Sequence, residues 1–94
     1  MSNILIEHSP SPMKLEVLGV DDWPVWEAAE SEMNVDADDT TIWVIEQGEA
    51  RIRETDAKNS ETVTISEGDM VTLMPGCKSL WVITKAITAH CSRG

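Results

Sequence analysis

The sequence predicts a single all-β domain, an antiparallel β-barrel or sandwich, and three observations lead to this prediction. Short stretches rich in β-branched residues alternate between apolar and polar positions, which is typical of strands with one buried face. Turn residues separate these stretches at intervals of about 8–12 residues, as in sandwiches and barrels. A chain of 94 residues is long enough for one hydrophobic core and too short for two domains. The strands are therefore expected to close around one core.

The first twelve residues are expected to form an N-terminal tail or an edge strand, ahead of a domain at residues 13–94. Pro10 and Pro12 exclude a strand through the end of this segment, because proline cannot donate to a sheet ladder. Ile4–Ile6 is apolar enough for an edge strand, which would pair within the barrel or across a dimer. The sequence leaves the tail and the strand open as alternatives.

Two further segments precede the strongest strand patterns. Lys14–Leu18 alternates polar and apolar residues, so it is predicted to be a strand that ends at Gly19. Residues 21–33 are ambiguous. Asp22 as an N-cap and Pro24 in the first turn favour a short helix, whereas a period of two residues would make the same segment a strand. Periodicity alone favours the helix.

The rest of the chain contains the clearest strand patterns, rich in Val, Ile, Thr and Trp and separated by polar turns. The expected strands are Thr41–Glu46, Ala50–Glu54, Thr62–Ser66, Met70–Met74, Trp81–Thr84 and Lys85–His90. The expected turns and loops are Asn34–Thr40, Gln47–Glu49, Thr55–Ser60, Glu67–Asp69 and Pro75–Gly76.

Charge and composition narrow the classes of function. The net charge of −10 argues against binding to nucleic acid or to anionic membranes, which both require clustered Lys and Arg. No apolar run approaches the ~20 residues of a membrane span, and the N-terminus lacks the pattern of a signal peptide. Cys77 and Cys91 are too few for a disulfide framework and are expected to be reduced thiols. The sequence therefore predicts a cytoplasmic protein.

Four sequence elements follow one another in a distinctive order. They are Trp23-Pro24-x-Trp26-Glu27, Trp43 to Glu49, Glu67 to Val71, and Pro75-Gly76 followed by Trp81-Val82. In this order and spacing they resemble the small single-domain cupins related to the C-terminal cupin half of (S)-ureidoglycine aminohydrolase. The resemblance covers about residues 15 to 90 and implies a cupin jelly roll in which residues 23 to 36 are strand. Gln47 is one residue more than the family has at this point, which predicts a β-bulge or a wider turn.

The resemblance also bears on metal binding. Metal-binding cupins place two histidines and a glutamate in the first motif and a histidine in the second. The matching positions here hold Asn34, Asp36, Thr40 and Ser79, so none is a histidine. One carboxylate, one amide and two hydroxyls make a poor transition-metal site. We therefore expect no metal and no other cofactor, which weakens the transfer of the metal-dependent aminohydrolase activity.

Three functions remain open at this point. The first is a metal-free binding module, in which the barrel holds a small polar or anionic organic molecule. The second is a small enzyme of the cupin superfamily, with Glu46, Cys77 and His90 as candidates for acid–base or thiol chemistry. The third is a homodimeric interaction protein with no ligand, joined through an edge strand. The candidate ligand-binding residues are Trp26, Asn34, Asp36, Thr40, Trp43, Ser79 and Trp81.

Each candidate also has a structural interpretation. The tryptophans can simply fill the core of a chain that has no Phe or Tyr. Cys77 can be a small buried thiol, and Glu46 can lie on the solvent face of its strand. The fold by itself does not choose among these functions.

Overall fold

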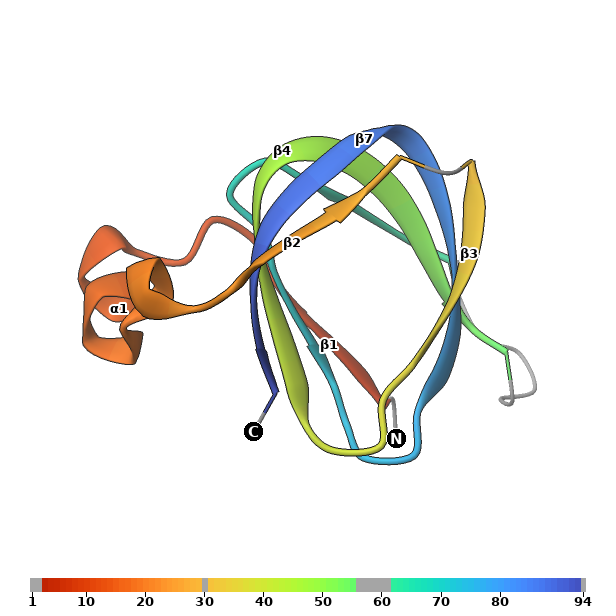
Figure 1. The fold of residues 1–94 in the computed structure, drawn as a ribbon, viewed down its shortest axis with the longest axis horizontal. Helices are drawn as coiled ribbons and strands as arrows, with labels where there is room; N and C mark the ends of the chain where they lie inside the picture. Colours follow the sequence, from red (N-terminus) through yellow and green to blue (C-terminus); the bar gives the residue numbers. More distant parts are fainter. Residues whose placement is uncertain (1–2, 30, 56–61, 94) are drawn as a thin grey trace.

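The computed structural model describes residues 3–29, 31–55 and 62–93. Within these residues one antiparallel sheet curls into a barrel, and a short helical segment projects from one side of it (Figure 1). The all-β fold predicted from the alternating pattern is confirmed. The strands are β1 (Ile4–Glu7), β2 (Val25–Ala28), β3 (Glu32–Asp36), β4 (Thr41–Glu54), β5 (Val63–Ser66), β6 (Met70–Leu73) and β7 (Lys78–Arg93), and the helices are α1 (Pro12–Leu18) and the 3₁₀ helix η1 (Val20–Asp22).

The two long strands β4 and β7 form the centre of the sheet. They pair antiparallel from Thr41 opposite Arg93 to Glu54 opposite Ser79. The strand order is β1-β6-β4-β7-β2, with β3 also paired to β7 and β5 also paired to β4. Every other strand thus joins β4 or β7 directly, except β1. Strand β1 joins through β6, with Ile4 opposite Leu73, so the N-terminal segment contains an edge strand of the same barrel.

The strand predicted at Lys14–Leu18 is wrong, because this segment lies in helix α1. The Ser11 hydroxyl accepts a hydrogen bond from the backbone N–H of Lys14, and Pro12 begins the helix. At the other end Gly19 adopts φ +71° and donates its N–H to the carbonyl of Glu16. These capping signals fix both ends of the helix, and they outweigh two apolar residues at alternate positions.

Residues 21–33 are not the helix that periodicity favours. Strand β2 and the start of strand β3 lie in this region, and β3 continues to Asp36, as the resemblance implied. Both pair with β7, with Trp26 opposite Ala89 and Val35 opposite Ser79. Pairing with a distant strand decides the structure here, because β-propensity depends on the neighbours that a strand meets. The expected loop at 34–40 is correspondingly shorter.

The turn predicted at Gln47–Glu49 is also wrong, since β4 runs without a break through these residues. The register between β4 and β7 shifts on both sides of Gln47, so the predicted β-bulge is confirmed. Strand β7 is likewise continuous where two strands were expected, at Trp81–Thr84 and Lys85–His90. Most of the predicted loop at Thr55–Ser60 lies outside the described residues.

Alternation along each strand sends one set of side chains into the barrel. Ile45, Ile52, Ile65, Leu73 and Trp81 are almost completely buried there and form one cluster. Val20 of η1 and Val44 of β4 are also buried but lie outside this cluster, where the helical segment meets the outer side of the sheet. Within the described residues no helix is long and apolar enough to cross a membrane.

Gly48 provides a test of the β4 bulge. It has φ +104°, and a Cβ at this position would lie 2.2 Å from the carbonyl oxygen of Ala86 on β7. Because backbone cannot move aside, we expect Gly48→Ala to lower the free energy of unfolding by at least about 3 kcal/mol. Gly76, at φ +83°, has open space around it, so Gly76→Ala should cost only about 1–2 kcal/mol. Urea unfolding followed by tryptophan fluorescence checks both values, and equal losses would contradict the close approach.

Candidate functional site

Three tryptophans from three strands meet inside the barrel. Trp26 of β2, Trp43 of β4 and Trp81 of β7 contact one another edge to face, with ring centroids 5.1 to 5.9 Å apart. This arrangement is favourable for aromatic rings because the positive edge of one meets the negative face of another. The structure therefore brings together three of the predicted ligand-binding residues, and it also uses them to fill the core.

Ser79 contacts this cluster through a hydrogen bond with Trp81. Its hydroxyl accepts a hydrogen bond of 3.0 Å from the indole N–H of Trp81 and donates one of 2.6 Å to the carbonyl oxygen of Val35. Ser79 is fully buried, and these two bonds satisfy the polar groups of all three residues. The predicted site residue Ser79 thus orients Trp81 and joins β7 to β3.

Trp43 differs from Trp81 in one respect. It is only 3% exposed, yet its indole N–H has no hydrogen-bond partner among the described residues. Trp43 also lines a small cavity of about 190 Å³, which we call the tryptophan cavity. Its other lining residues are Trp26, Met33, Asn34, Val35, Asp36 and Thr41.

Three more of the predicted ligand-binding residues lie at this cavity or beside it. Asn34 and Asp36 are exposed and pair across the sheet with Leu80 and Lys78, whereas Val35 between them is buried opposite Ser79. Alternation therefore puts Asn34 and Asp36 on the other face of β3 from Ser79, where they form a polar rim. Thr40 precedes β4 and does not line the cavity.

Thr41 lines the cavity instead of Thr40, and the prediction missed it. Thr41 and Trp43 are two residues apart on β4 and share its inward face. The positions that match the first cupin motif were found by counting back from Gly48 with one residue allowed for Gln47, and this count reached Thr40. Counting by twos from Trp43, an inward residue, finds Thr41 directly.

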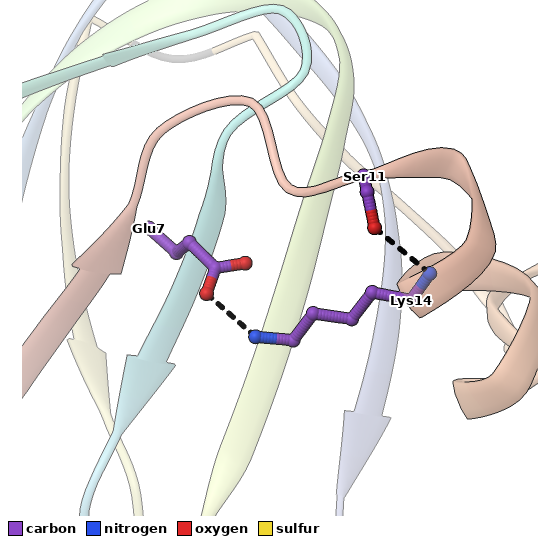
Figure 2. A network of polar contacts seen from close by, with 3 residues as sticks. All are labelled: Glu7, Ser11 and Lys14. Carbon is purple, nitrogen blue, oxygen red and sulfur yellow. Dashed lines mark hydrogen bonds and ion pairs between the residues drawn. The ribbon is translucent and has the colours of Figure 1, made fainter.

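A second, larger cavity lies on the outer side of the sheet. It has a volume of about 720 Å³, is open to solvent and lies between the helical segment and the β4–β7 layer; we call it the outer cavity. The Glu7–Lys14 ion pair ties α1 to β1 on one side, and the Ser11 cap lies next to it (Figure 2). The residues that line the outer cavity are Pro12, Leu15, Glu16, Val20, Asp21, Val44, Ile45, Glu46, Glu67, Gly68 and His90.

Two catalytic candidates, Glu46 and His90, meet at the outer cavity. The Nε2 of His90 lies 2.6 Å from Oε1 of Glu46, and its Nδ1 lies 3.2 Å from the carbonyl oxygen of Trp23. Both neighbours of the ring are acceptors, so both nitrogens donate only when the imidazole is protonated. Burial lowers the pKa of His90, but the bonds to Trp23 and Glu46 and the charges of Glu46 and Asp21 together raise it above its ordinary value.

The third catalytic candidate, Cys77, lies elsewhere. It is 1% exposed and belongs to the interior cluster, where Ala89 and Cys91 also lie. His90 stands between those two residues on β7 and therefore points to the opposite face. The structure does not bring Cys77 and His90 together as a thiol–imidazole pair.

Comparisons with known proteins show the family of this chain. The family model for the EutQ-like cupin domain matches residues 15–90. The chain belongs to the EutQ-like cupin family. No match was found among curated proteins. The expected specificity of the ureidoglycine aminohydrolase type stays a prediction.

Two solved structures resemble this cupin. A DUF861 family protein from Thermotoga maritima has a TM-score of 0.87 and 28% sequence identity, covering 97% of this chain and 99% of that chain. A protein of unknown function (DUF1255) from Acidithiobacillus ferrooxidans has a TM-score of 0.64 and 9% identity, covering 70% of this chain and 60% of that chain. The second likeness concerns the fold alone.

The side chains of this cupin do not fit the metal site of metal-binding cupins. Asn34 and Asp36 lie on the opposite face of the sheet from Ser79, and the Ser79 hydroxyl is already bonded on both sides. No group of three or more His, Cys, Asp or Glu that could hold a metal occurs in the part of the chain that the structure describes. A transition metal needs imidazole, thiolate or several carboxylates, and this donor set lacks them.

The buried Ser79 hydroxyl yields a stability prediction. Ser79→Ala leaves the indole N–H of Trp81 and the carbonyl of Val35 without this partner, so we expect unfolding to become easier by about 1–3 kcal/mol. Ser66→Ala, at an exposed position of β5, is the matched control and should change stability by less than about 0.5 kcal/mol. Chemical denaturation measures both; a neutral Ser79→Ala would contradict the two bonds.

The raised pKa of His90 yields a prediction on pH. Protonation of His90 stabilises the folded state. This stabilisation is fully present at a pH below 6.5, the ordinary pKa of the ring, and it is lost as the pH rises through the raised pKa of the folded state. We expect His90→Gln to remove this part of the pH dependence of unfolding, and Glu46→Gln to lower the pKa of His90. Unfolding curves across this pH range and an NMR titration of the ring measure the two effects. Glu27→Gln, an exposed carboxyl on β2, is the control and should leave the titration of His90 unchanged.

Proposed function

We propose that this cupin binds a small, uncharged polar molecule in the tryptophan cavity without a metal ion. One observation carries the proposal: Trp43 lines the cavity, and its buried indole N–H has no partner among the described residues. A buried donor without an acceptor costs about 1–3 kcal/mol. A ligand oxygen that accepts this bond recovers that cost, so the cavity favours molecules with a carbonyl or a similar acceptor.

The size and lining of the cavity describe the ligand further. A volume of about 190 Å³ corresponds to about six water volumes, which suits a molecule with few non-hydrogen atoms. Trp26, Met33 and Val35 supply apolar surface, and Asp36 at the rim carries a negative charge. The negative charge of Asp36 disfavours an anion, and its carboxylate oxygens can accept hydrogen bonds from N–H groups. An amide-type molecule therefore fits better than a carboxylate.

The two other functions are less well supported. The Glu46–His90 pair faces the outer side of the sheet, so it does not act on a molecule beside Trp43. The aminohydrolase-type activity implied by the sequence resemblance depends on a metal, and the donor set for that metal is missing. Homodimer formation stays an expectation, and the proposed binding does not depend on it.

The indole N–H resonances test the proposal directly. Acetamide and propionamide, added to the full chain, should shift the indole signal of Trp43 saturably, whereas sodium acetate and methylammonium chloride should not. Trp43→Phe identifies this signal and should weaken amide binding about two- to tenfold, the value of one hydrogen bond. Trp23→Phe, a change outside the core cluster, should leave amide binding unchanged.

Two results would overturn the proposal. The first is an indole signal of Trp43 that no amide shifts while the protein remains folded. The second is amide binding that Trp43→Phe and Trp23→Phe weaken equally. A stability measurement on each variant separates lost binding from lost folding.

A further inference from the structure

The outer cavity is independent of the tryptophan cavity and lies on the other face of the sheet. His90 on β7 and Val44 on β4 pair opposite each other on its floor, and both point away from the barrel interior. Its volume of about 720 Å³ falls within the range of small-molecule sites. The cavity therefore has room for an organic ligand and is separated from the barrel interior by a β-layer.

One wall of the outer cavity is apolar. Val20 and Val44 are buried, and Leu15 of α1 is half-buried above them. Helix α1 has no buried residue, so it stands over the cavity and does not pack closely on the sheet. The helical segment is nevertheless held on both sides. The Glu7–Lys14 ion pair ties α1 to β1. After the helix, Val20 is buried and the carbonyl oxygen of Trp23 contacts the ring of His90. A ligand with an aliphatic part can pack between Leu15 and Val44.

The charged residues around the cavity indicate the sign of the charge that a ligand would carry. Glu16, Asp21 and Glu67 line it, and no Lys or Arg is among its lining residues. His90 is cationic only when it is protonated, and it lies 2.6 Å from Glu46, so the carboxylate offsets that charge locally. The net charge of −10 adds an attractive field for cations over the whole molecule.

We propose that the outer cavity binds a small organic cation, a primary ammonium group on a short aliphatic chain. The ammonium group donates to the carboxylates of Glu16 and Glu67, and the aliphatic chain packs against Leu15, Val20 and Val44. This site does not depend on the proposed function, because it uses other residues on the other face of the sheet.

The test is a titration of the full chain with n-butylammonium chloride, followed by methyl NMR. We expect saturable shifts of the methyl signals of Leu15, Val20 and Val44, with a dissociation constant of about 1 mM. Sodium butyrate has a chain of similar length and the opposite charge, and at equal ionic strength it should produce no such shifts. The indole signal of Trp43 should stay unchanged, which distinguishes this site from the tryptophan cavity.

A pair of charge-matched double variants makes the test specific. Glu16→Gln with Glu67→Gln removes two carboxylates from the cavity and should weaken butylammonium binding about fivefold, as expected for exposed ion pairs. Glu27→Gln with Glu32→Gln removes the same charge from exposed positions of β2 and β3, and should weaken it less than about twofold, through the general field alone.

The proposal is overturned by any of three results. These are the absence of methyl shifts at the outer cavity, equal binding of butyrate and butylammonium, and equal weakening by the two double variants. Each variant is first checked for the wild-type pattern of indole signals, so that a folding defect is not counted as lost binding.

Discussion

The antiparallel pairing of β4 with β7 is the interaction on which the rest of the structure depends. It joins two long segments far apart in the sequence, and β2, β3, β5 and β6 all attach to it. The bulge near Gln47 bends the pair, and Gly48 lets the backbone of β4 approach that of β7 closely at this point. The curvature that results lets one sheet enclose a core and present a second, outer face.

This pairing also separates residues that are neighbours in the chain. Ile45 and Ala89 pair inside the barrel, while Glu46 and His90, the next residue in each strand, meet outside it. A strand sends successive side chains to opposite faces, so each strand contributes to two environments. The interior gathers tryptophans beside a small cavity with Asn34 and Asp36 at its rim, and the exterior gathers carboxylates and one imidazole around a larger cavity.

The family assignment and the side chains describe this cupin at different levels. The match to the EutQ-like cupin domain shows the family over residues 15–90. The side chains at the metal-site positions are of the wrong type and lie on different faces, so the proposed binding in the barrel relies on hydrogen bonds and aromatic surface. Trp43 carries both, because its ring packs in the core while its N–H remains without a partner among the described residues.

The sequence by itself determined the fold class, most of the strands, and the turns at Gly68 and Pro75. Local alternation and turn residues carry this information, because they act within a few residues. It also named the three tryptophans that meet. It missed helix α1, whose signal lies in the capping residues Ser11 and Gly19, and it therefore missed the outer cavity that the helix covers.

Only the tertiary structure decided which of the candidate site residues lie close to one another. Glu46 and His90 are far apart in the sequence and meet because β4 and β7 pair in one register, whereas Cys77 points to the other face. The register of β3 with β7, in which Val35 lies opposite Ser79, likewise puts Asp36 and Ser79 on different faces. Register is a long-range property that one added residue reverses, so no local pattern in the chain could have fixed it.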